Sequence, residues 1–345
     1  MPPALPPVQA TPRPTDLPDA LDVYFAPHQE GATFFNPWGR WERPGVDKML
    51  RWKLGSNAFR AEKRTPPELP RVPDPMAAWR SLPEGARVLW LGHASVLVEI
   101  DGLHVLIDPV FGRVGGLMAR ATPLPLAPDD LPEIDVVMLT HGHMDHCDLA
   151  SLRWLGARHP DALFVVPRGL ERVLPAACAR RLPLDWWEHT TVRGVDLHLV
   201  PAQHWHSRGF DVNAALWGGV VIRGSRTLYH SGDTGAFGGF EAIGRVFPGI
   251  DVAVLPLGAY EPRWFMASQH MSPEASVQAW VDLGARRFLG MHWGTFDLTD
   301  EPLDHGPRVL LPSLLAERGL DPARVHVVPH GASLGFGAAD GAVAG

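Results

Sequence analysis

The sequence has little cysteine, no long apolar run and no block of positive charge. Only Cys147 and Cys178 occur among 345 residues, which is too few for a disulfide framework, and they lack the C-x-x-C spacing of zinc fingers. No stretch approaches the roughly 18 apolar residues that a transmembrane helix needs. The formal net charge is -7, so the long-range field repels a phosphate backbone. Nucleic acid is therefore not expected as a partner.

The N-terminal part of the chain is rich in proline. Residues 1–24 have neither a basic segment nor an apolar core, so they do not resemble a secretory signal, and the expected localisation is cytoplasmic with at most peripheral membrane contact. The hydrophobic content of 46% is sufficient for a large core. We expect a Pro-rich arm over residues 1–84 and a folded main domain over residues 85–345.

Within the arm, residues 34–55 interleave aromatic side chains with basic ones. Trp38, Trp41 and Trp52 alternate here with Arg and Lys, as in segments that lie on a lipid interface. A strap packed on the main domain explains the same residues equally well, because 44–55 has only a modest helical apolar period. Both alternatives remain open at this point.

The main domain alternates predicted strands with predicted helices. Two apolar strands, 95–100 and 103–107, flank Asp101-Gly102, the dipeptide favoured in tight hairpin turns. Helices are predicted at 76–81, 148–157, 168–180, 273–284 and 307–318, and further strands lie between them. Antiparallel hairpins followed by strands interspersed with helices indicate an α/β fold with mixed sheets.

The run Thr140-His141-Gly142-His143-Met144-Asp145-His146 follows the apolar stretch 136–139 directly. Neutral imidazole and carboxylate are ligands that zinc, iron and manganese share. An i, i+2 pair on extended chain turns both side chains to one side, so His141 and His143 can bind one metal while Asp145 and His146 face a second. The pattern predicts half of a two-metal site.

Four later segments place further polar residues at the ends of apolar runs, where strands usually pass into functional loops. They contain His204, Asp233, the pair Gln269-His270, and His292. The order H-x-H-x-D-H, then His, Asp and His resembles the metallo-β-lactamase superfamily. The resemblance implies a four-layer αβ/βα sandwich with a dinuclear metal site at one edge.

Within that superfamily, the chain is similar to the N-acyl-phosphatidylethanolamine-hydrolysing phospholipase D family. The segments that carry this likeness are 90–95, 201–205, 231–235, 258–266, 269–270 and 292–296, together with 36–38 and 50–52 in the arm. The resemblance implies a metal-dependent phosphodiesterase that releases N-acylethanolamine and phosphatidic acid, and it suggests a homodimer.

The resemblance also assigns roles to residues. His141, His143 and His204 would hold the first metal, Asp145, His146 and His292 the second, and Asp233 would bridge both. Two Zn²⁺ ions are the expected cofactors, with Fe or Mn as alternatives. His270 and Asp145 are the predicted catalytic residues, and Asp108 is predicted to orient a ligand histidine. The predicted substrate-binding residues are Met144, Gln269, His270 and Tyr260.

One residue departs from the family pattern. Mammalian members carry Tyr where this chain has Met144, which leaves the identity of the lipid open and favours a more adaptable apolar pocket. His93, His206 and His230 lie beside motifs without matching a ligand position, so structural roles are predicted for them, and Cys147 is predicted to be a small buried side chain. Two other functions remain possible: a lactonase that uses the same metals, and a metal-binding scaffold without turnover.

Overall fold

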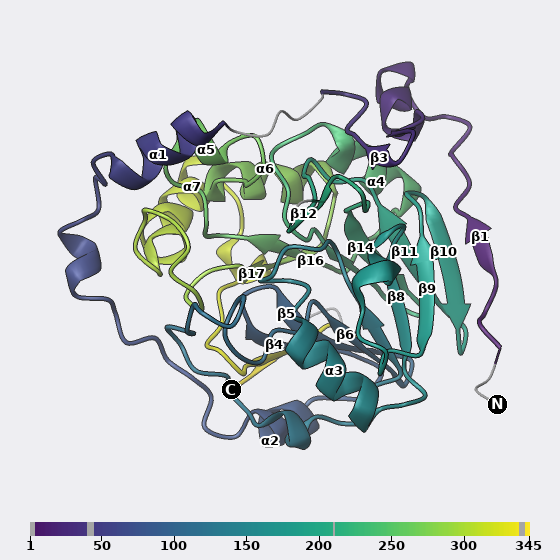
Figure 1. Ribbon diagram of the computed structural model, residues 1–345. Helices are drawn as coiled ribbons and strands as arrows, with labels where there is room; N and C mark the ends of the chain where they lie inside the picture. The colour runs from purple at the N-terminus through teal and green to yellow at the C-terminus, as the bar shows by residue number, and fades with distance from the viewer. Residues whose placement is uncertain (1–3, 40–44, 210, 338–341) are drawn as a thin grey trace.

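The computed structural model describes residues 4–39, 45–209, 211–337 and 342–345, and in these residues two eight-stranded sheets face each other (Figure 1). The first sheet has the order β20 (Val343–Ala344), β19 (Ser333–Gly335), β4 (Ala86–Gly92), β5 (Ser95–Ile100), β6 (Leu103–Ile107), β7 (Val136–Met138), β8 (Leu163–Pro167) and β9 (Arg180–Leu184). The second has the order β1 (Val8–Ala10), β10 (Glu188–Val192), β11 (Val195–Val200), β14 (Gly219–Arg223), β15 (Thr227–His230), β16 (Val252–Pro256), β17 (Arg287–Met291) and β18 (Val325–His326).

Helices α2 (Pro75–Ser81) and α3 (Leu149–Arg158) pack on the outer face of the first sheet, and α6 (Pro273–Asp282) packs on the second, beside α4 (Gly239–Val246) and α7 (Leu311–Glu317). Helices α1 (Val46–Leu54) and α5 (Arg263–Met266) contact each other through Trp52 and Phe265. Two short hairpins complete the fold, β2 (Gln29–Glu30) with β3 (Thr33–Phe34) and β12 (Ser207–Arg208) with β13 (Asp211–Val212). The predicted four-layer sandwich is confirmed.

Both sheets are mixed, as predicted. Strands β4, β5 and β6 pair antiparallel, whereas β6 to β9 run parallel. In the second sheet β10, β11, β14 and β15 are antiparallel and β15 to β18 are parallel. The predicted turn between β5 and β6 has both Asp101 and Gly102 at positive φ, which is why Asp-Gly suits it.

Side-chain alternation divides the buried residues between layers. On β4, Val88 and Trp90 join the main core between the sheets, whereas Leu89 and Leu91 join a second cluster with Leu152 of α3. Successive side chains of a strand point to opposite faces, so a strand covered on both faces is apolar throughout. This explains why the strands carry continuous apolar runs.

The predicted helix over residues 168–180 was wrong. Only a short 3-10 turn, Leu170–Val173, forms there, and strand β9 begins at Arg180. Pro183 and the two arginines weaken the strand pattern, but β9 is an edge strand, where proline is tolerated. Strand pairing with β8 therefore decided the local structure, and sequence periodicity alone did not reveal it.

Much of the arm contacts the two sheets. Strand β1 pairs with β10, the Thr11 amide donates to the Trp187 carbonyl at 2.6 Å, and Phe25 stacks on Trp187 with ring centroids 4.4 Å apart. Trp38 stacks on Trp186 at 5.4 Å, and its Nε1 donates to the side chain of Gln203. Trp38 therefore packs on the main domain, as the strap alternative predicts.

The other two tryptophans of residues 34–55 are Trp41 and Trp52. Trp41 lies outside the described residues. Trp52 lies on α1, where its ring packs 4.7 Å from Phe265 and its Nε1 donates to Asp300 at 3.0 Å. No helix in the described part of the chain combines the length and apolarity needed to cross a bilayer.

Candidate metal centre

The predicted ligands all follow the carboxyl ends of strands. The run from His141 to His146 follows β7, and the other ligands come after β11, β15 and β17 of the opposite sheet, at His204, Asp233 and His292. Because these strand ends meet at one edge of the sandwich, residues up to 151 positions apart come together there. Backbone geometry assists: His292 sits at φ 59°, in the left-handed region, which turns its side chain out of the strand direction.

Donor atoms of six of the seven predicted ligands converge in two neighbouring groups. His141, His143 and His204 form one group, with the His204 Nε2 atom 3.1 Å from Nδ1 of His143. Asp145, His146 and His292 form the other, within a set that also contains His93. The atoms of each group lie within 4.8 Å of one another, close enough to share an ion.

Asp233 lies between the two groups. Its Oδ2 is 3.1 Å from Nε2 of His146 and 3.8 Å from Nε2 of His141, and its Oδ1 is 3.0 Å from Nε2 of His292. The side chain is 2% exposed. A buried carboxylate that faces histidines of both groups has the position required of a bridging ligand.

The buried polar atoms at the centre fit metal ions better than they fit one another. Among the described residues, Nε2 of His141, His146 and His292 and Oδ1 of Asp233 have no hydrogen-bond partner. Leaving such groups unpaired in a protein interior costs about 1–3 kcal/mol each. Imidazole nitrogens with an oxygen ligand between them suit zinc, iron or manganese, and divalent ions would satisfy all four atoms.

The electrostatics of the centre favour neutral imidazoles on one side. Burial lowers the pKa of His143 to about 4, and burial together with His146 and neighbouring imidazoles lowers that of His141 well below its usual value. Burial also lowers the pKa of His204. Neutral imidazole is the form that binds a metal, so these three residues present lone pairs at pH 7.

The other side of the centre contains more carboxylates. Burial opposes charge on His146, but Asp233, Asp145 and Asp108 outweigh it and raise its pKa. Burial alone would raise the pKa of Asp233, yet nearby His146 and His292 hold it well below its usual range. The result is an ionised carboxylate surrounded by imidazoles.

Asp108 contacts His146, one of the predicted metal ligands. Its Oδ2 accepts from Nδ1 of His146 at 2.7 Å and from the Thr140 hydroxyl at 2.5 Å, while its Oδ1 accepts from the Thr140 amide at 2.8 Å. The carboxylate is fully buried. Because the ionised carboxylate can only accept, the proton of a neutral His146 stays on Nδ1 and leaves the Nε2 lone pair directed toward Asp233 and the centre of the cluster.

A cavity of about 390 Å³ opens beside this centre. Met144, Gln269 and His270, all predicted to bind substrate, line it together with Asp145 and Asp233. Its other walls are mostly apolar and come from four segments: Met49, Trp52, Trp205, Ser207, Ala259, Phe265, Met266, Leu298 and Thr299. The cavity therefore joins a polar metal face to an apolar chamber.

Tyr260 does not line this cavity. Its ring is 2% exposed, its hydroxyl contacts Nδ1 of His305 at 2.6 Å, and its amide donates to Glu301. It supports the loop after β16 from behind the site. The predicted contact with substrate is therefore corrected to a packing role.

His270 does face the centre. Its Nδ1 lies 3.8 Å from Oδ2 of Asp233, and its side chain is 14% exposed. Burial lowers the pKa of His270 to about 4, so the imidazole is neutral at pH 7. It is thus prepared to donate a hydrogen bond rather than to carry a positive charge.

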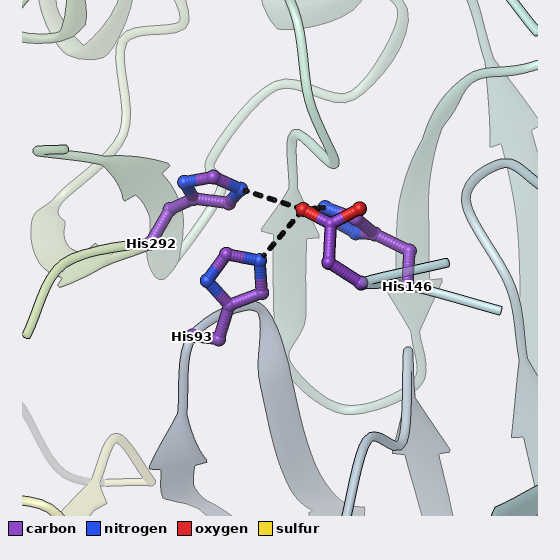
Figure 2. Close-up of side chains that lie close together, drawn as sticks. His93, His146 and His292 are labelled. Atoms are coloured by element: carbon purple, nitrogen blue, oxygen red, sulfur yellow. Dashed lines mark hydrogen bonds and ion pairs between the residues drawn. The ribbon is translucent and has the colours of Figure 1, made fainter. Parts of the chain in front are cut away.

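The histidines that the motifs left aside have different surroundings. His230 contacts only backbone at its two nitrogens, the Ala94 carbonyl at 2.9 Å and the Gly232 amide at 3.0 Å. His93 differs, because its Nε2 lies 3.1 Å from Oδ2 of Asp145. Figure 2 shows His93, His146 and His292 around one carboxylate. The sequence placed His93 beside a motif and predicted a structural role for it, but it did not identify Asp145 as the partner.

Comparison with known proteins agrees with this architecture. Residues 104–293 match the model of the Beta-lactamase superfamily domain. The chain is 31% identical to N-acyl-phosphatidylethanolamine-hydrolyzing phospholipase D 1 of Caenorhabditis elegans, over 88% of this chain and 92% of that protein. The mitochondrial protein of the same name in Saccharomyces cerevisiae is 34% identical over 61% of this chain and 48% of its own length.

Two further comparisons concern hydrolases of other groups. A UPF0173 metal-dependent hydrolase of Pyrobaculum aerophilum is 31% identical over 65% of this chain and 91% of its own. The solved structure of a metallo hydrolase from Ignicoccus hospitalis superposes with a TM-score of 0.55 at 23% identity, over 70% of this chain and 94% of that one, and shows the shared fold.

The fold and the site together define a metal-dependent hydrolase of the β-lactamase superfamily. Within that superfamily, the chain belongs to the N-acyl-phosphatidylethanolamine-hydrolysing phospholipase D family.

Proposed function

We propose that this protein binds two divalent metal ions, most suitably Zn²⁺, and hydrolyses N-acyl-phosphatidylethanolamine or a closely related phospholipid. The products would be N-acylethanolamine and phosphatidic acid. The observation that carries the proposal is the apolar cavity of about 390 Å³ that opens onto the His/Asp cluster. A phosphodiester with long acyl chains needs both surfaces next to each other.

In this proposal His141, His143 and His204 hold the first ion, Asp145, His146 and His292 hold the second, and Asp233 bridges the pair. When bound, two such ions supply a hydroxide at neutral pH and neutralise charge on the phosphate oxygens. The remaining tasks fall to the side chains of the cavity.

Those side chains divide by chemistry. His270, neutral and 14% exposed, is positioned to donate a hydrogen bond to a phosphate oxygen or to the oxygen of the leaving group. Gln269 is fixed by Trp205, whose Nε1 donates to its side-chain oxygen at 2.5 Å, and it shapes the polar wall. Met144, Met49 and Met266 line the apolar wall, and flexible thioethers adapt to acyl chains of different length.

Helix α1 supports contact with a lipid surface. Beside the cavity it exposes Met49, Leu50 and Leu54 by 43%, 51% and 80%, and its basic residues Lys48, Arg51 and Lys53 would attract anionic headgroups. We propose that the protein approaches its substrate with this helix against the membrane. Loss of vesicle binding in the double variant Leu50→Ser, Leu54→Ser would support this, and unchanged binding would contradict it.

The test of function is product analysis by mass spectrometry. Metal-loaded protein is incubated with N-acyl-phosphatidylethanolamine in detergent, beside protein stripped of metal. Metal-dependent release of both N-acylethanolamine and phosphatidic acid is expected. If the protein contains two metals but releases neither product, the lipid assignment fails, and a lactone or another phosphodiester becomes the substrate to test.

A further inference from the structure

His93 occupies the turn between β4 and β5, with its side chain directed into the metal centre. The residue is 1% exposed and has φ 55°, a conformation uncommon outside glycine. Its Nε2 lies 3.1 Å from Oδ2 of Asp145, and its ring centroid is 3.8 Å from that of His292 (Figure 2). The ring centroid of His146 lies 5.3 Å away, so within the described part of the chain the imidazole neighbours all three proposed ligands that are specific to the second ion.

The backbone of His93 is bound to the same region. Its carbonyl accepts from the His292 amide at 2.9 Å, and its amide donates to the Thr295 hydroxyl at 2.6 Å. Thr295 in turn contacts Nε2 of His330 at 2.8 Å. Through its backbone His93 therefore fixes the turn that carries His292, and through its side chain it reaches Asp145, which comes from a different loop.

The hydrogen-bonding pattern indicates how His93 acts. Nε2 of His146 and of His292 has no hydrogen-bond partner among the described residues, whereas Nε2 of His93 contacts Asp145 at hydrogen-bonding distance. A carboxylate oxygen has two lone pairs, so Oδ2 of Asp145 can accept from an imidazole N–H and still face an ion. His93 thus has the geometry of a partner that orients a ligand rather than of a ligand.

We propose that His93 is the positioning residue of the second metal site. It holds the Asp145 carboxylate by a hydrogen bond and the His292 turn by its backbone, so that both ligands keep one geometry. Occupancy of the second site depends on this contact, while the first site, built from His141, His143 and His204, does not. The inference rests on the two-metal centre of the proposed function.

The experiment is a metal titration of three variants and the unchanged protein. His93→Ala removes the side chain, and His93→Gln places an amide N–H near the position of Nε2. His198→Ala is the matched control, because His198 is also a buried histidine, 4% exposed, but contacts Thr11. Metal content after dialysis is measured by mass spectrometry, and affinity for each ion by competition with a chelator.

The unchanged protein is expected to bind two ions. In His93→Ala the affinity for the second ion should fall roughly 10- to 100-fold, with the first ion unaffected. His93→Gln should recover most of that loss, and His198→Ala should bind both ions normally. With Co²⁺ as probe, only the absorption bands of the second ion should weaken in His93→Ala.

Three results would overturn the inference. Normal second-ion affinity in His93→Ala would show that the contact does not matter. If His93→Gln were as defective as His93→Ala, the hydrogen bond would not be the cause. If the unchanged protein bound no metal, the proposed centre itself would fail, a result read from that protein alone.

A second variant tests the same inference in case His93→Ala does not fold. Thr295→Val leaves the imidazole in place but removes the hydroxyl that accepts from the His93 amide. A smaller loss of second-ion affinity, with the first ion unaffected, is expected. Equal weakening of both ions would indicate general damage to the fold and would contradict a role specific to the second site.

Discussion

Replacing Asp108 with Asn tests how the protein prepares His146 for a metal. Oδ1 of Asp108 accepts from the Thr140 amide at 2.8 Å, so the carbonyl oxygen of an Asn must occupy that position. Its NH₂ group then faces Nδ1 of His146, where the carboxylate oxygen accepted at 2.7 Å. An amide N–H there favours a proton on Nε2, the atom that faces the metals.

The expected magnitude follows from that change of tautomer. Loss of an orienting carboxylate behind a metal-bound histidine typically lowers affinity about 10- to 100-fold, which corresponds to about 1.4–2.8 kcal/mol. The loss should fall mainly on the ion held by His146. Hydrolysis at saturating metal should recover in part, because added metal can overcome the unfavourable tautomer.

The assay is competition between the protein and a chelator of known zinc affinity, with activity followed as zinc is added back. Asp251→Asn is the matched control, because Asp251 is also buried and accepts from a backbone amide, that of Thr227, at 2.9 Å, yet lies away from the centre. The control should bind zinc normally. Normal zinc affinity in Asp108→Asn would refute the reasoning.

Three further variants test the cavity and the fold. Met144→Ala, at a residue 46% exposed at the cavity, should lower kcat/KM for long-chain lipid by roughly threefold to tenfold without changing metal content; equal rates on long and short chains would argue against an acyl contact. Trp52→Ala removes the hydrogen bond to Asp300 and should raise KM for vesicle substrate roughly tenfold, and an unchanged KM would show that α1 does not contact the substrate. Burial and nearby His189 lower the pKa of His198 from 6.5 to about 3. The contribution of the neutral imidazole to the free energy of unfolding is therefore complete above pH 6.5 and is lost as the pH falls toward 3. At pH 5 this loss of stability is about 2 kcal/mol. In urea unfolding, His198→Asn should reduce the change of unfolding free energy with pH, and an unchanged pH dependence would refute the role given to His198.

Four of the seven proposed ligands were predictable from the sequence because their spacing reflects local geometry. His141, His143, Asp145 and His146 lie in one loop, so their grouping needs no knowledge of the fold. His204, Asp233 and His292 each end an apolar strand, but only the family resemblance could join them to that loop. Asp108 was found by the same reasoning, since it ends the strand β6 beside β7.

The features that were missed depend on packing between distant segments. No local pattern shows that His93 meets Asp145. The contact forms only when β4 and β7 join the same sheet and bring the turn after β4 next to the loop after β7. Tyr260 was assigned to substrate from its motif, but Glu301 and His305, more than 40 positions later, turn it inward. Helix α4 was not predicted, because glycine at positions 238, 239 and 244 obscures its helical pattern.

The C-terminal strands have a consequence for the order of folding during synthesis. Strand β18 belongs to the second sheet, whereas β19 pairs with β4 of the first, and His330 between them lies 4.2 Å from the ring of Trp90. Until residues 325–335 leave the ribosome, one edge of β4 stays unpaired and the turn carrying His93 lacks the support that reaches it through Thr295. The nascent chain can thus support the proposed second metal site in this way only after residues 325–335 have been translated.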